Sequence, residues 1–289
     1  MYNYIYGSKK DIQSHPKNFL IFVKRLLPKY ANSLPDSGAI TLFDMVKKLG
    51  LKKSSIIETG VGASTISFFL ACYLFNKKLY SFDHNPDKIS LLKTVINEAI
   101  CSPLNIKISD YWTPIPSNSV DKYTGINCLS EFKENFNLGF FDSAHSLKFL
   151  LEEISTFHKI ANKKFILGID DGEKINNREF HFDFINMIRT KINLKKIKNP
   201  KSNNCDYFYK EVENFLKDNS KKVLKLETFF QKNLENDLYF NFFGNDTSYE
   251  ANEDKKDIDD FKYQNIFKKV PIKEKKIYKN RISFFEIYK

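Results

Sequence analysis

The chain has 289 residues, of which 42% are hydrophobic and 15% aromatic, and its formal net charge at pH 7 is +11. This apolar content excludes a globally disordered chain, and the length fits one enlarged domain or a core with an accessory segment. No apolar run approaches the roughly 18 residues of a membrane span, and no secretory signal is visible. Four scattered cysteines fit reduced thiols. We therefore expect a cytoplasmic protein that does not insert into a membrane.

The positive charge alone does not identify a partner. Of 46 basic residues only four are arginine, the residue best suited to bidentate recognition of phosphates and bases. A solvated lysine surface is the favoured interpretation, and a polyanion such as a nucleic acid stays open as the alternative. Homo-oligomerisation is open as well.

β-Strand and helix patterns alternate along most of the chain. Apolar spacing predicts helices over residues 16–30, 36–50, 63–75, 86–99, 147–160 and 178–191. Short β-branched or apolar runs predict strands over residues 54–60, 78–83, 105–109, 137–142 and 164–169, with a loop-rich stretch over 110–135. Repeating units of this length predict an α/β fold with a mostly parallel sheet and helices on both faces.

These patterns predict that the chain is organised in four segments. Residues 1–53 are an N-terminal helical cover, and 54–200 form the core. Residues 201–261 are expected to be an insertion, helical over 212–240 and a polar loop over 244–260. Residues 262–289 alternate like a strand pair that could complete the sheet in the antiparallel direction.

The most specific motif is Glu58-Thr-Gly60-Val-Gly62-Ala-Ser64-Thr65, which lies between the first strand and its helix. Glycines in such a turn let a ligand approach the backbone, and ligands of open α/β sheets bind at the carboxyl ends of the strands. Asp83 ends the next strand and can accept both hydroxyls of a ribose.

Two ligand classes compete for this turn. A dinucleotide site requires a third glycine where this chain has Thr65, and Glu58 would repel a pyrophosphate. Glu58 suits a ligand with a cationic group instead. A dinucleotide site and a packing turn that binds nothing are the alternatives.

An acidic residue followed by GxG resembles the first motif of class I S-adenosylmethionine-dependent methyltransferases, which have a Rossmann-like fold. The resemblance implies that Glu58, Gly60 and Gly62 contact the amino-acid moiety of S-adenosylmethionine and that Asp83 binds its ribose. It also implies an adenine contact at Asp110, expected just after the third strand. The complete predicted cofactor-binding set is Glu58, Gly60, Gly62, Ser64, Asp83, His84 and Asp110.

Three carboxylates follow the fourth and fifth strands. Asp142 ends the fourth strand, and the pair Asp170-Asp171 ends the fifth. Carboxylates that converge repel one another unless a cation is bound, and Mg²⁺ typically takes one or two of them together with water. In the alternative, Asp142 only borders the cofactor and the pair caps the following helix.

Phe141-Asp142-Ser-Ala-His145-Ser and Gly168-Ile-Asp170-Asp171-Gly172 resemble the metal-dependent sugar O-methyltransferases of the macrocin and novobiocin type. More distantly they resemble the catechol and caffeoyl-CoA enzymes. The resemblance implies that Asp142, Asp170 and Asp171 hold Mg²⁺. It places His145 where the catechol enzymes have a lysine proposed as general base, so His145 and Asp142 are the predicted catalytic residues.

The expected function is therefore S-adenosylmethionine-dependent O-methylation of a small-molecule hydroxyl, sugar-like or phenolic, with a divalent metal. A metal-independent methyltransferase acting on RNA or another acceptor is one alternative. A non-catalytic module that binds the cofactor is the other.

Overall fold

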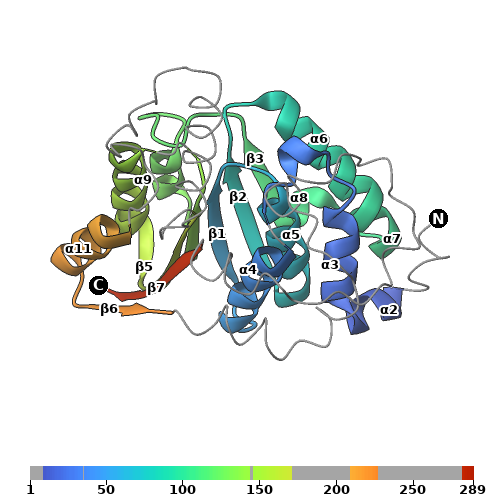
Figure 1. The fold of residues 1–289 in the computed structure, drawn as a ribbon, viewed down its shortest axis with the longest axis horizontal. Coiled ribbons are helices and arrows are strands. Elements are labelled where there is room, and N and C mark those ends of the chain that lie inside the picture. The colour runs from blue at the N-terminus through green and yellow to red at the C-terminus, as the bar shows by residue number, and fades with distance from the viewer. Residues whose placement is uncertain (1–8, 35, 144–145, 171–208, 227–281) are drawn as a thin grey trace, which may run out of the picture.

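A seven-stranded sheet forms the centre of the computed structural model, which describes residues 9–34, 36–143, 146–170, 209–226 and 282–289 (Figure 1). The strands are β1 (Ser54–Thr59), β2 (Lys77–Phe82), β3 (Trp112–Ile115), β4 (Phe136–Phe141), β5 (Ala161–Ile169), β6 (Lys222–Lys225) and β7 (Ser283–Tyr288). Their order is β3-β2-β1-β4-β5-β7-β6. β1 to β5 are parallel, and β7 runs antiparallel to both of its neighbours. The strand order therefore reverses between β1 and β4.

Helices cover both faces of this sheet (Figure 1). One face carries α2 (Lys9–Ser14), α3 (Pro16–Lys24), α4 (Asp36–Lys48), α5 (Ala63–Phe75), α6 (Pro86–Ile96), α7 (Ser102–Leu104) and α8 (Ile108–Tyr111). The opposite face carries a 3₁₀ turn (Ile126–Glu131), α9 (Leu147–Ile160) and α11 (Tyr209–Asn219). Successive strand residues belong to different cores: Ile56 packs with the first set and Ile57 with the second. The predicted α/β fold with a mostly parallel sheet is confirmed.

Three helices begin at the carboxyl edge of the sheet. α5 follows the glycine turn, with Gly62 as its N-cap residue. α6 begins at Pro86 after Asn85, whose side chain accepts hydrogen bonds from two backbone N–H groups of the first turn. α9 begins after Ser146, whose hydroxyl accepts from the N–H of Phe149. These helix starts surround the ends of β1, β2 and β4.

The prediction for the third strand is wrong. Residues 105–109 are not a strand: the helical turn α8 begins within them, at Ile108, and β3 begins at Trp112. The apolar residues of that stretch, Ile106 and Ile108, pack partly buried against the helical core. A proline such as Pro114 usually argues against a strand, but an edge strand tolerates proline, and β3 is at the edge of the sheet. Asp110 consequently precedes β3, at the amino edge of the sheet, so the reason for its predicted adenine contact is wrong.

The C-terminal part also differs from expectation. The helix expected from residue 212 is α11, which ends at Asn219, and the chain then forms β6. β7 is antiparallel, as expected of the tail, but its outer partner is β6 rather than a second tail strand. The helix expected over 178–191 and the loop expected over 244–260 lie outside the described residues. Among the described helices, none has the length and hydropathy needed to cross a membrane.

Candidate ligand site at the carboxyl edge of the sheet

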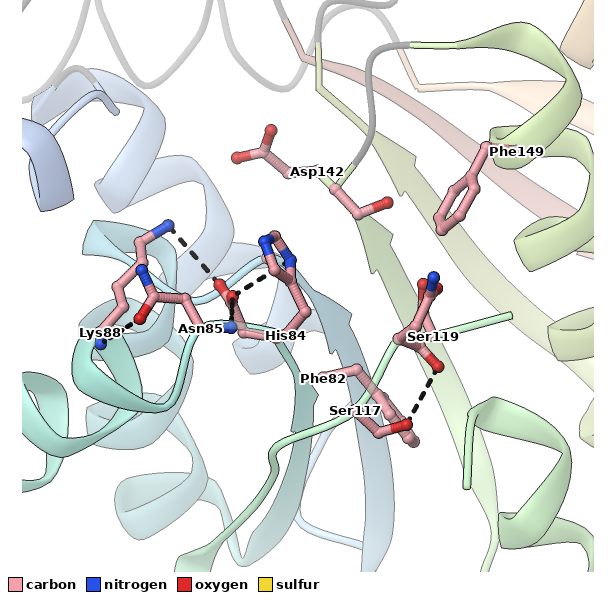
Figure 2. Close-up of a pocket in the computed structure, with 12 residues that line it drawn as sticks. Phe82, His84, Asn85, Lys88, Ser117, Ser119, Asp142 and Phe149 are labelled. Carbon is pink, nitrogen blue, oxygen red and sulfur yellow. Dashed lines mark hydrogen bonds and ion pairs between the residues drawn. The ribbon is translucent and has the colours of Figure 1, made fainter. Parts of the chain in front are cut away.

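A pocket of about 500 Å³ opens at the carboxyl edge, where β1, β2 and β4 end (Figure 2). This is the point at which the strand order reverses, the usual ligand position in open α/β sheets. The lining residues are Gly60, Phe82, Asp83, His84, Asn85, Lys88, Ser117, Asn118, Ser119, Asp142, Ser143 and Phe149. Four residues of the predicted site, Gly60, Asp83, His84 and Asp142, are among them.

Three consecutive backbone donors of the glycine turn are used inside the protein. The N–H groups of residues 60–62 donate, in order, to the carbonyl of Phe82 at 2.8 Å, Oδ2 of Asp83 at 3.0 Å and Oγ1 of Thr65 at 3.0 Å. A pyrophosphate bound by this turn would need such groups to point at it. The turn is thus shaped by its own hydrogen bonds and offers none of these three donors to a phosphate.

Gly60 is required by the close approach of β1 to β4. Its φ is +81°, and a Cβ at this position would lie 1.9 Å from the carbonyl oxygen of Asp142. Gly62 is extended, and its Cβ would meet the carbonyl oxygen of Ala31 at 3.2 Å. Gly62 therefore lies beneath the N-terminal cover and does not line the pocket.

Glu58 lies behind the turn and is fully buried. Its Oε2 accepts hydrogen bonds from the hydroxyls of Thr65 at 2.9 Å and Ser81 at 2.7 Å. Burial raises the pKa of Glu58 to about 7, although the hydroxyls of Ser64, Ser81 and Thr65 favour its charged form. Neither Glu58 nor Ser64 lines the pocket, so their expected ligand contacts stay predictions.

Asp83 joins the turn to the pocket. Its Oδ2 accepts from the N–H of Val61, and its Oδ1 accepts from the N–H of Asn85 at 2.9 Å. The ammonium of Lys88 lies 3.6 Å from Oδ2, too long for a good hydrogen bond. A carboxylate has about four lone-pair sites, so the two backbone bonds leave about two acceptor sites for a ligand. The neighbouring His84 is exposed at the pocket wall (Figure 2).

The opposite wall was not identified from the sequence. It consists of Ser117, Asn118 and Ser119 after β3, Ser143 after β4, and Phe149 in the first turn of α9. Ser119 and Phe149 lie across the pocket from His84 and Lys88 (Figure 2). Placing the third strand at residues 112–115 would have identified the segment after it as part of this edge.

Two of the three predicted metal ligands are described. Phe141, the last residue of β4, pairs with Ile169, the last residue of β5. Asp142 and Asp170 therefore come directly after neighbouring strand ends. The N–H of Asp170 donates to the carbonyl of Phe141 at 3.1 Å. Asp142 lines the pocket, whereas Asp170 is buried and does not.

Asp171 and His145, the third metal ligand and the predicted base, lie outside the described residues. Within the ranges that are described, no three His, Cys, Asp or Glu side chains come together in a way that could hold a metal ion. The adjacent strand ends are compatible with two carboxylate ligands, and the full set stays a prediction.

No family model and no curated protein matches the chain. Among solved structures it is similar to the apo form of a TDP-rhamnose 3'-O-methyltransferase of calicheamicin biosynthesis, at 16% identity and a TM-score of 0.39 over 57% of this chain and 73% of that one. It is similar to a precorrin-6y C5,15-methyltransferase from Geobacter metallireducens GS-15, at 11% identity and a TM-score of 0.40 over 66% and 74% of the two chains. A geranyl diphosphate methyltransferase in complex with SAM matches at 12% identity and a TM-score of 0.38 over 86% and 82%. Similarity at this level is too low to assign an activity.

Proposed function

We propose that this chain is an S-adenosylmethionine-dependent methyltransferase that methylates a hydroxyl group of a small molecule. The observation that carries the proposal is the combination of Asp83, at the end of β2, with the glycine turn at the end of β1. A carboxylate with unused acceptor sites faces the pocket, while the glycine turn beside it has no N–H group available at residues 60–62. A ribose without a pyrophosphate fits this arrangement.

The same observation argues against a dinucleotide. Thr65 stands where a third glycine would be needed. Its hydroxyl accepts a hydrogen bond from the N–H of Gly62 and donates one to Glu58. The N–H of Gly62, which a pyrophosphate at this helix start could use, is thereby engaged. An oxidoreductase that uses a nicotinamide dinucleotide is the less supported choice.

The charges of the pocket favour a cationic ligand. Asp83, Asp142 and Lys88 line it, with Lys88 held near Asp83, so the carboxylates outnumber the ammonium group. Negative side chains attract a sulfonium and an ammonium group, both of which S-adenosylmethionine carries. Its ribose would bind Asp83, with each hydrogen bond to the carboxylate contributing about 1.5–3 kcal/mol.

In the proposed reaction the acceptor oxygen attacks the methyl carbon in line, the sulfur–methyl bond breaks, and the acceptor hydroxyl loses its proton to a base. His145, aided by Asp142, is the proposed proton acceptor, since an imidazole is suited to this role near neutral pH. Phe149 supplies an apolar surface on the wall opposite Asp83. The protein thus contributes mainly alignment and proton removal, because the methyl donor is already activated.

A divalent metal is part of the proposal. Asp142, Asp170 and Asp171 would hold Mg²⁺, which would lower the pKa of the acceptor hydroxyl. Titration of Mn²⁺ followed by its electron paramagnetic resonance tests this without an acceptor. We expect binding by the unmodified chain, loss in Asp142→Asn, and no change in Glu152→Gln, an exposed acid on α9.

Calorimetric titration with S-adenosylhomocysteine and with NADH tests the cofactor assignment. We expect binding of the first only, weakened at least about tenfold in Asp83→Asn because the ribose loses a charged acceptor. Asp87→Asn is the matched control: this exposed acid lies four residues further on, in the first turn of α6, and should leave the affinity unchanged. Binding of NADH alone, or equal affinity for the Asp83 and Asp87 variants, would refute the proposal. Binding without methyl transfer to any hydroxyl acceptor would instead indicate a non-catalytic module.

A further inference from the structure

Glu153 is a buried carboxylate that no step proposed above uses. It lies on α9 and is 1% exposed. Its Oε1 accepts hydrogen bonds from two hydroxyls, that of Ser119 and that of Ser143, the second at 2.7 Å. Both serines line the pocket, one after β3 and the other after β4. One carboxylate therefore holds together two loops that are 24 residues apart in sequence and form one pocket wall.

The direction of these bonds limits what the serines can do for a ligand. A hydroxyl has one proton and two lone pairs. Because Ser119 and Ser143 both donate their proton to Glu153, each oxygen has only acceptor capacity left for the pocket. This wall therefore favours a ligand group that donates hydrogen bonds, and it penalises a group that can only accept them.

The arrangement does not depend on the charge of Glu153. Burial raises the pKa of its carboxyl group to about 7, while the hydroxyls of Ser119 and Ser143 favour the charged form. In the part of the chain that is described, Oε2 has no hydrogen-bond partner. A proton on Oε2 would leave Oε1 free to accept from both serines. The two hydroxyls thus point to Glu153 in either protonation state.

We propose that Glu153 is a positioning residue that fixes Ser119 and Ser143 as hydrogen-bond acceptors, so that the pocket selects a purine with an exocyclic amine over one with a carbonyl at the same position. The inference rests on the proposed function: a ribose bound at Asp83 would place its base in the pocket that Ser119 and Ser143 also line. It assigns the discrimination between bases to a residue that does not itself line the pocket.

The test compares S-adenosylhomocysteine with its deaminated analogue, S-inosylhomocysteine, in which a carbonyl replaces the amine. We measure the affinity of both by calorimetry for the unmodified chain and for Glu153→Gln and Glu153→Leu. The ratio of the two affinities is the readout, because a general loss of packing weakens both ligands alike. A mismatched hydrogen bond predicts a ratio of about ten or more in the unmodified chain.

Glu153→Gln retains a carbonyl oxygen that accepts from both serines, so the ratio should be preserved. Glu153→Leu frees both hydroxyls to rotate and donate, so the ratio should fall to about three or less. Glu152→Leu, on the neighbouring exposed position, is the matched control and should keep the ratio. If Glu153→Leu does not fold, Ser119→Ala and Ser143→Ala remove the acceptors one at a time and should each lower the ratio.

An unmodified chain that does not discriminate, or a Glu153→Leu variant that discriminates as well as the unmodified chain, overturns the inference. Either result is compatible with Asp83-dependent binding of S-adenosylhomocysteine, in which case the proposed function stands. Absence of binding of both compounds to the unmodified chain refutes the proposed function and this inference together.

Discussion

At the scale of single residues, the groups that shape the pocket lie behind its surface. Glu58 accepts hydrogen bonds from the hydroxyls of Thr65 and Ser81. The indole N–H of Trp112 in turn donates a hydrogen bond to the hydroxyl of Ser81 at 3.0 Å. This chain of bonds connects β1, β2, β3 and the start of α5 at one buried carboxylate. Glu58 therefore orders the turn that Asp83 also binds, which is a structural task separate from contacting a ligand.

Gly60 offers a sharp test of the close contact between β1 and β4. In Gly60→Ala the new Cβ would lie 1.9 Å from the backbone carbonyl oxygen of Asp142, and the alanine would also have to adopt a positive φ. Gly50→Ala is a matched control, because Gly50 has a φ of +73° with nothing within 4 Å of the added carbon. We expect Gly50→Ala to lower the free energy of unfolding by about 1–2 kcal/mol and Gly60→Ala to lower it by at least about 2 kcal/mol more.

Urea denaturation of the two variants measures this difference. Equal losses for Gly50→Ala and Gly60→Ala would mean that the ends of β1 and β4 are not in contact as described. Weaker binding of S-adenosylhomocysteine should accompany the Gly60 substitution only, since Gly60 lines the pocket and Gly50 does not.

At the scale of elements, the sequence predicts best where one pattern suffices. The helices expected over residues 63–75 and 147–160 have these bounds in the structure, because a long apolar segment and a regular stripe are local signals. β3 and β6 are four residues each and depend on their neighbours. The alternation of apolar and polar residues around Ile106 and Ile108 is as typical of a strand as the sequence of β3. Only packing against the sheet decides which of the two segments becomes the strand.

The C-terminal strand β7 shows how strongly a short element can depend on position. It lies between β5 and β6, and its successive side chains point to opposite faces of the sheet. Phe284 therefore packs in the first core and Phe285 in the second. We expect Phe285→Ala to cost about 3–5 kcal/mol of stability, because its side chain is fully buried. Leu224→Ala in the adjacent β6, where the side chain is 37% exposed, should cost less than about 1 kcal/mol.

Denaturation midpoints of the two variants test this ordering. Similar, small losses at both positions would contradict the central position of β7. A loss confined to Phe285→Ala would support the register in which Phe285 pairs with Leu167 of β5 and Lys225 of β6.

At the scale of the whole molecule, the fold follows from the sequence more fully than the pocket does. Gly60, Asp83 and Asp142 each come directly after a strand, so knowledge of the strands alone places them at one edge. Ser119, Ser143 and Phe149 line the same pocket only because their loops and α9 return to that edge. Glu153 has no sequence signal at all, since a glutamate on a helix is usually exposed. Pairing between distant segments, which local patterns do not encode, supplies the second wall.

Burial of two acids also makes the stability of the molecule depend on pH. The pKa of Glu58 is about 7, above the ordinary value of 4.5 that we expect in the unfolded chain. Below pH 4.5 this group is protonated in both states and does not oppose folding. As the pH rises toward 7, the unfolded chain loses this proton while the folded protein keeps it, so the free energy of unfolding falls, and above about pH 7 the loss is complete.

Glu58→Gln removes this dependence at one site. A shift of this size corresponds to about 3 kcal/mol, so the stability of the unmodified chain relative to Glu58→Gln should fall by about 2–3 kcal/mol between pH 5 and pH 8. Taking the difference cancels the other titrating groups, including Glu153. Urea denaturation at the two pH values measures it, with Glu152→Gln as the control whose difference from the unmodified chain should stay nearly constant, because that side chain is exposed. A difference for Glu58→Gln that stays constant or rises with pH would show that Glu58 is ionised in the folded protein throughout this range.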